Sequence, residues 1–125
     1  MTNYLSLEKL KTYNLARKLG DIVWIIFEQL DLETKKIFGY QFVESTESIG
    51  ANISEGYGRY HFLDKAKFYY NARGSLIESR HWFDVLIKRN KLTNNKLINT
   101  YLSVYKELRL ALNGLIKSIF NNKGS

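Results

Sequence analysis

Four stretches of this chain carry apolar residues at the spacing of an amphipathic α-helix, and no proline interrupts them. The last stretch has the most regular stripe: Leu97, Tyr101, Val104, Leu108, Ala111, Leu112, Leu115 and Ile119. The other three predict helices over about residues 7–30, 40–55 and 63–90. Because the connections between the helices are short, the sequence predicts an all-α fold, an antiparallel up-down-up-down four-helix bundle.

The predicted bundle has a single hydrophobic core. A chain of 125 residues is long enough for one domain, which we assign to residues 1–125, with the core at about 7–119 and a polar tail at 121–125. The residues expected to face inward from the first three helices are Leu15, Leu19, Ile22, Val23, Ile26 and Leu30; Phe42, Thr46, Ile49 and Ile53; and Phe68, Ala72, Ser75, Ser79, Phe83 and Leu86, with Trp82 at the margin.

Polar and glycine residues mark the expected helix ends. Residues 31–39 are expected to form a charged connection that ends at Gly39, and Thr93 is expected to cap the fourth helix. Gly56 and Gly58 are expected to adopt the left-handed backbone angles that end a helix. A glycine pair without the strand and lysine of a phosphate-binding loop favours a helix–helix connector over a phosphate site.

A polar ridge lies beside the apolar stripe of the second predicted helix. Ser48, Asn52 and Glu55 follow at i, i+4 and i+7, on a different face from the core residues. A catalytic or metal-binding role for Glu55 lacks a second carboxylate at a suitable spacing. We therefore expect the ridge to be structural and to hydrogen-bond a neighbouring helix or subunit. The candidate partners are Arg59, Arg73 and Ser75.

The segment that contains this ridge resembles a known family. Asn52-Ile53-Ser54-Glu55-Gly56-Tyr57-Gly58-Arg59 is similar to the N-I-x-E-G-Y-G-R signature of small four-helix-bundle proteins encoded in intervening sequences of bacterial 23S rRNA genes. Ala72-Arg73-Gly74-Ser75-Leu76-x-Glu78 gives a second match, and the resemblance spans about residues 7–119. It implies a bacterial protein that assembles into pentameric rings. The motif residues to which we assign structural roles are Asn52, Glu55, Gly56, Tyr57, Gly58, Gly74, Ser75 and Glu78.

The positive charge is concentrated in the second half of the chain. Residues 59–125 carry thirteen basic and four acidic side chains, a net charge of +9, whereas residues 40–58 carry three acidic side chains and no basic one. This asymmetry favours a polyanionic partner, nucleic acid above all; a solvated basic surface without a partner is the alternative. Arg73 and Arg80 are about 10 Å apart along the third helix. The candidate nucleic-acid-binding residues are Arg59, Tyr70, Arg73, Arg80, Lys88, Lys106 and Lys117.

Trp24 projects from the side of the first helix opposite its apolar stripe, with Ile25 and Phe27 beside it. An over-wide core stripe would explain Phe27 but not Trp24. An exposed aromatic group of this kind usually marks a partner surface. We therefore expect a homo-oligomer with Trp24 in the interface.

Two functions fit these patterns. The first is a non-enzymatic, oligomeric protein that binds nucleic acid, RNA or DNA, with a link to rRNA implied by the resemblance. The second is a protein-interaction scaffold, because the accessory variability proteins of diversity-generating retroelements are similar in architecture and charge and serve a reverse transcriptase as adaptors.

The sequence contains no constellation that predicts catalysis. His61 and His81 each have one carboxylate at helical spacing, without an inward-facing cluster on other helices. We therefore expect no catalytic residue, no metal and no cofactor. The chain has no cysteine, no apolar run near the roughly 20 residues of a membrane span, and no signal-peptide pattern. A soluble, cytoplasmic protein without membrane contact is the expectation.

Overall fold

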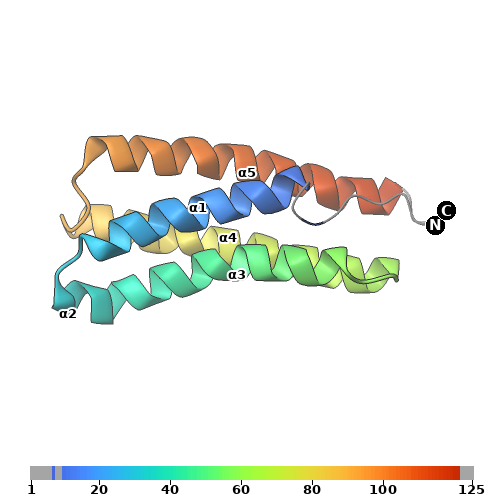
Figure 1. The fold of residues 1–125 in the computed structure, drawn as a ribbon, viewed down its shortest axis with the longest axis horizontal. Helices are drawn as coiled ribbons and strands as arrows, with labels where there is room; N and C mark the ends of the chain where they lie inside the picture. Colours follow the sequence, from blue (N-terminus) through green and yellow to red (C-terminus); the bar gives the residue numbers. More distant parts are fainter. Residues whose placement is uncertain (1–6, 8–9, 122–125) are drawn as a thin grey trace.

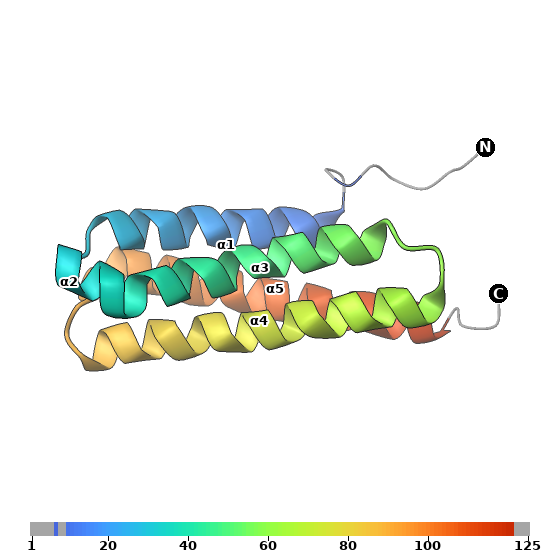
Figure 2. The ribbon, with the colours of Figure 1, turned by 90° about the horizontal axis from the view of Figure 1, so that it is seen from below.

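The computed structural model describes residue 7 and residues 10–121, and this part of the chain contains four long helices and no strand. The long helices are α1 (Lys11–Glu28), α3 (Tyr40–Tyr57), α4 (Phe62–Lys88) and α5 (Asn95–Asn121). They lie side by side, and each runs opposite to the long helix before it (Figures 1 and 2). Helices α1 and α4 each contact α3 and α5, so the cyclic order around the bundle is α1, α3, α4, α5. The predicted all-α four-helix bundle is confirmed.

The charged connection predicted over residues 31–39 is helical from Leu32 onward. Two short elements lead directly into α3: α2 (Leu32–Thr34) and a π-helical turn (Lys35–Gly39). The Asp31 carboxylate caps α2 by accepting the backbone N–H of Thr34 at 2.9 Å, and this bond is the main cause that lowers the pKa of Asp31. Gly39 does not end a helix. A Cβ at this buried glycine would lie 2.9 Å from the Phe27 ring, so glycine allows α1 to pack closely.

The inward stripes predicted for the first and second helices are buried throughout. In α4, Phe68 and Ser75 are only half-buried, and Tyr69 and Leu76 take inward positions that we did not predict. The reason lies on α3, where Gly56 leaves room for the Tyr69 ring: a Cβ there would come within 2.7 Å of a Tyr69 ring carbon. The predicted stripe of α5 is correct, with several members at the edge of the core, but it omitted the buried Ile116.

A chain of hydroxyl groups crosses the core and joins α3, α4 and α5. Thr46 Oγ1 donates to the Phe42 carbonyl oxygen at 2.7 Å and lies 2.7 Å from Ser79 Oγ. Ser79 Oγ lies 2.8 Å from the Tyr101 hydroxyl, whose pKa is raised by burial. Because each hydroxyl has one proton, Ser79 donates to Thr46 and Tyr101 donates to Ser79. The chain satisfies these buried groups and fixes the three helices relative to one another.

The end of α3 and the end of α4 differ from the predictions. Among the described residues no glycine has a positive φ, so the prediction that Gly56 and Gly58 are left-handed is wrong. Gly58 follows α3 with φ −79°, and Lys65 Nζ donates to the carbonyl oxygens of Gly56 and Tyr57 at 3.1 Å. The left-handed residue is Asn90, with φ 59°, after α4. Asparagine is one of the few residue types that accept this conformation readily.

The start of α5 is capped by Asn94, and the prediction of Thr93 as the cap is wrong. Asn94 Oδ1 accepts the backbone N–H of Leu97 at 3.1 Å. The helix begins at Asn95, which places Asn94 rather than Thr93 at the capping position. Across residue 7 and residues 10–121, none of the helices has the length and apolar character to cross a membrane.

Candidate nucleic-acid interface

The cyclic order of the helices gives the bundle four long sides, and we call one opposite pair of them the α4/α5 flank and the α1/α3 flank. Most of the predicted nucleic-acid-binding residues lie along the α4/α5 flank, where α4 and α5 run side by side (Figure 2). Trp24 lies on the α1/α3 flank, which is built from the helices that carry the acidic segment 40–58. The two kinds of predicted surface are therefore on opposite sides of the molecule.

At one end of the α4/α5 flank, Arg73 is held between the two helices. Its Nη1 donates to Asn113 Oδ1 on α5 at 3.2 Å, and its guanidinium carbon lies 4.9 Å from the centre of the Tyr70 ring. The Tyr70 ring centre lies 6.1 Å from that of Phe120, which meets Phe62 edge-on at 4.9 Å. This end of the flank combines a fixed cation with a cluster of aromatic rings from both helices.

Two turns further along α4, Arg80 repeats the combination of cation and aromatic ring. Its Nε donates to Asp84 Oδ1 at 3.0 Å, and its guanidinium carbon lies 5.3 Å from the centre of the Tyr105 ring on α5. The bond to Asp84 is the main cause that raises the pKa of Arg80, so the side chain stays charged. The Arg80 side chain is 40% exposed, and a phosphate can reach it.

Three of the remaining candidates are exposed lysines on α4 and α5, and the fourth, Arg59, lies elsewhere. Lys88 is exposed two turns beyond Arg80, while Lys106 and Lys117 are exposed on α5. Arg59 does not join them: its Nη2 pairs with Glu55 at 2.7 Å, and its guanidinium carbon lies 5.0 Å from the ring centre of Phe68, which faces α3. Contacts across α4 and α5 thus connect three of the seven predicted residues, Tyr70, Arg73 and Arg80, and three more are exposed lysines on the same two helices.

Sequence reasoning left out two members of this flank. Arg109 is exposed on α5, four residues from both Tyr105 and Asn113, the residues that contact the arginines of α4. Phe120 is exposed near the end of α5. Spacing within α5 could have indicated Arg109, whereas the contact between Phe120 and Tyr70 depends on how the two helices are aligned.

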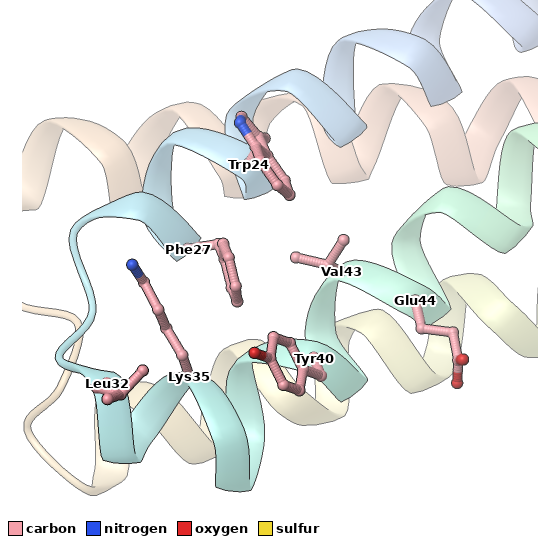
Figure 3. Close-up of a pocket in the computed structure, with 7 residues that line it drawn as sticks. All are labelled: Trp24, Phe27, Leu32, Lys35, Tyr40, Val43 and Glu44. Carbon is pink, nitrogen blue, oxygen red and sulfur yellow. The ribbon is translucent and has the colours of Figure 1, made fainter.

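The α1/α3 flank carries an apolar groove of about 450 Å³ beside α2 and the π-helical turn (Figure 3). The Trp24 and Phe27 rings are stacked with centroids 5.2 Å apart, and the Tyr40 ring lies 5.7 Å from Phe27. Trp24 is 48% exposed and Tyr40 is 56% exposed. Lys35 and Glu44 lie at opposite ends of the groove (Figure 3). Trp24 is therefore part of an exposed aromatic row rather than an isolated side chain.

The polar ridge of α3 bonds locally. Asn52 Nδ2 donates to the Ser48 carbonyl oxygen at 2.9 Å, and Glu55 pairs with Arg59, one of the expected partners. The contact to a neighbouring helix that we expected of the ridge is made instead by Thr46, which reaches Ser79 on α4. The ridge points away from the core stripe, so its side chains bond within α3 and the turn that follows it.

In the second motif segment Ala72 and Leu76 face the core, while Gly74 and Glu78 lie on the outer side of α4. Gly74 is exposed, and a Cβ there would meet no other group within 4 Å, so nothing in the structure requires a glycine. Ser75 is half-buried, and Glu78 accepts the indole N–H of Trp82 at 3.2 Å. These contacts stabilise the helix surface.

The described residues do not include three His, Cys, Asp or Glu side chains placed to hold a metal ion together. His61 and His81 are both exposed, at the start and in the middle of α4. The partly buried Lys65, whose pKa is lowered by burial, donates to backbone carbonyls at the end of α3. Its contacts give Lys65 a structural role.

Comparisons with known proteins agree with this architecture. The family described as 23S rRNA-intervening sequence protein matches residues 8–114. The chain is similar in structure to a protein of unknown function from the S23 ribosomal protein family of Bacteroides thetaiotaomicron, with a TM-score of 0.76, 21% identity, and coverage of 85% of this chain and 95% of that one. At this identity the likeness shows the fold alone. Among curated proteins, none matches the chain.

Proposed function

This chain belongs to the 23S rRNA-intervening sequence protein family, and from that membership we propose a function: a non-enzymatic, basic homo-oligomer that binds nucleic acid. The observation that carries the proposal is the α4/α5 flank. Arg73 and Arg80 are held there against aromatic rings, with exposed lysines around them. Guanidinium groups fixed in this way pair with phosphates without losing much further side-chain freedom.

The distribution of charge supports binding at this flank rather than all over the surface. Helix α3 carries three acidic residues and no basic one, and it lies on the side opposite α5. Helix α1 is nearly balanced, with three basic and two acidic residues, whereas α4 and α5 together carry nine basic and four acidic ones. A polyanion is therefore attracted more strongly to the α4/α5 flank than to the α1/α3 flank. Of the two candidate arginines on the α4/α5 flank, Arg80 is bonded to a carboxylate, that of Asp84.

The salt dependence of binding tests this proposal. We expect affinity for fragments of 23S rRNA to fall steeply with salt, with a slope of roughly 0.7–0.9 in log K against log salt for each phosphate contact. Arg80→Gln should lower that slope by about one contact in each engaged subunit, while its amide can still bond to Asp84. Because phosphate contacts carry little base information, the loss should be similar for all sequences.

Lys18→Gln provides the matched control, because it removes the same charge from an exposed site on α1. Equal losses from Arg80→Gln and Lys18→Gln would show that only the net charge of the protein matters. Absence of binding to any RNA or DNA at low salt would refute the proposal.

The proposed self-association rests on the groove of the α1/α3 flank. Its exposed aromatic row is the kind of surface that a partner covers, and its lining is mostly apolar. Family resemblance implies a pentameric ring, in which the groove would meet a different surface of the next subunit. Trp24→Glu should yield smaller species with unchanged helix content in far-UV circular dichroism. Light scattering that shows a wild-type monomer at micromolar concentration would contradict this part.

The groove also favours the second function, a protein-interaction scaffold that includes the role of reverse-transcriptase adaptor. If the wild-type protein is monomeric and binds no nucleic acid, the groove is available for a different protein. A Trp24→Glu variant that loses a co-purifying partner but keeps its own mass would then support the scaffold function.

A further inference from the structure

The α4/α5 flank exposes aromatic rings that phosphate binding does not require. Tyr70 is 42% exposed and Phe120 is 40% exposed, and their ring centroids lie 6.1 Å apart across the two helices. A flank that only neutralises phosphates needs cations and hydrogen-bond donors. The aromatic rings therefore indicate a ligand that presents the flat faces of bases.

The width of the flank excludes the usual way of reading a duplex. An α-helix with its side chains is about 10–12 Å across, so two helices packed side by side are about 20 Å wide. The major groove of B-DNA is about 12 Å wide and admits a single helix. The two helices of the α4/α5 flank therefore cannot enter the major groove together, and most of their contacts with a duplex would be with its backbone. In a duplex the bases stack on one another, so Tyr70 and Phe120 would gain no contact with base faces.

We propose that the α4/α5 flank binds single-stranded nucleic acid in preference to a duplex, an inference that rests on the proposed function. Unpaired bases stack on Tyr70 and Phe120, while Arg73 and Arg80 pair with the phosphates that follow. Arg73 lies over the Tyr70 ring and Arg80 near the Tyr105 ring, and guanidinium planes also stack on bases. The surface from Tyr70 to Lys88 is about 27 Å long, enough for several nucleotides.

Fluorescence anisotropy measures the affinity of the protein for a labelled oligonucleotide of about 12 nucleotides, made once as RNA and once as DNA. Each oligonucleotide is tested as a single strand and after annealing to its complement. We expect the single strands to bind more tightly than either duplex. Tyr70→Leu should weaken single-strand binding by about 5- to 150-fold, the range measured for loss of one stacked base. It should leave duplex binding and the salt slope unchanged, because no charge is lost. Tyr70→Phe keeps the ring and should keep the affinity.

Tyr60→Leu is the matched control, because Tyr60 is 91% exposed but lies in the turn before α4. It should bind like the wild type. Equal affinity for single strand and duplex, or unchanged single-strand affinity in a folded Tyr70→Leu variant, would overturn the preference while leaving phosphate binding intact. Failure of every probe to bind would refute the proposed function itself, so the two outcomes are distinguishable.

Discussion

Replacing Gly56 with alanine tests the closest packing contact between α3 and α4. A Cβ at this position would lie 2.7 and 2.8 Å from two Tyr69 ring carbons and 3.1 Å from Phe68 Cβ. The Tyr69 ring is buried and cannot swing away without displacing its neighbours. Overpacking of this kind costs about 1–3 kcal/mol. Alanine regains less than about 1 kcal/mol of helix propensity near the end of a helix. We expect Gly56→Ala to lower the free energy of unfolding by about 1–2 kcal/mol.

Gly74→Ala is the matched control, because it makes the same chemical change in a helix. A Cβ at Gly74 would have no other group within 4 Å, so only the propensity gain of about 0.5–1 kcal/mol applies. The two changes in the free energy of unfolding should therefore have opposite signs and differ by about 1.5–3 kcal/mol. At about 4 °C per kcal/mol for a chain of this length, the difference in Tm is about 10 °C.

The assay is urea unfolding at one fixed protein concentration, with the mass of the assembly measured for each variant. The effects of the two substitutions on stability should also be coupled. Gly56→Ala should lower the free energy of unfolding less in a Tyr69→Leu background, because the leucine side chain is smaller than the tyrosine ring. Stability changes of equal sign and size in the two glycine variants would refute the packing explanation. An unchanged cost in the Tyr69→Leu background would refute it as well.

Three further predictions concern stability. Ser79→Ala leaves the buried Tyr101 hydroxyl without its acceptor and should cost about 1–3 kcal/mol in urea unfolding. Asn94→Ala removes the cap of α5 and should cost about 1 kcal/mol, whereas Thr93→Ala should be near neutral; equal effects would contradict the assignment of the cap. Burial raises the pKa of Tyr69 from 10.0 to about 12. The stability that the neutral Tyr69 side chain contributes to the folded state is therefore fully present below pH 10 and is lost as the pH rises toward 12. Tyr69→Phe should therefore remove up to about 1.4 kcal/mol of the stability that is lost between pH 8 and 11.

The sequence predicts best what depends on spacing within one helix. The buried stripes of α1 and α3 follow from apolar residues at helical intervals. The cap at Asp31 also had a local signal, an acidic residue three positions before Thr34, and it indicated a helix within the predicted connection. No local signal indicates whether Phe68 or Tyr69 faces the core, because two adjacent aromatic residues fit the same helical wheel. The contact with Gly56, on another helix, decides which of them faces inward.

The candidate site shows the same division. The basic row of α4 follows from positions on one helix, and it was predicted by residue. Three contacts of this row depend on how α4 is aligned with α5: Arg73 with Asn113, Arg80 with Tyr105, and Tyr70 with Phe120. That alignment is set by contacts between helices, including the bond between Ser79 and Tyr101. Spacing along a single helix contains no information about it, so Tyr70 could be predicted but its aromatic neighbours on α5, Tyr105 and Phe120, could not.

The positions of the two flanks separate assembly from ligand binding. The Trp24 groove and the Arg73–Arg80 row lie on opposite sides of the bundle, so assembly leaves each α4/α5 flank open if the groove meets the next subunit outside that flank. A strand long enough to reach two subunits then gains avidity without any new contact, by the effective concentration of the second flank. A strand of about eight nucleotides, which covers the roughly 27 Å of one flank at about 3.4 Å per nucleotide, gains nothing. Trp24→Glu should therefore weaken binding of long strands by about tenfold or more and leave short strands unaffected, as measured by anisotropy. Equal weakening of both would mean that Trp24 itself touches the nucleic acid, and the division of roles between the flanks would be wrong.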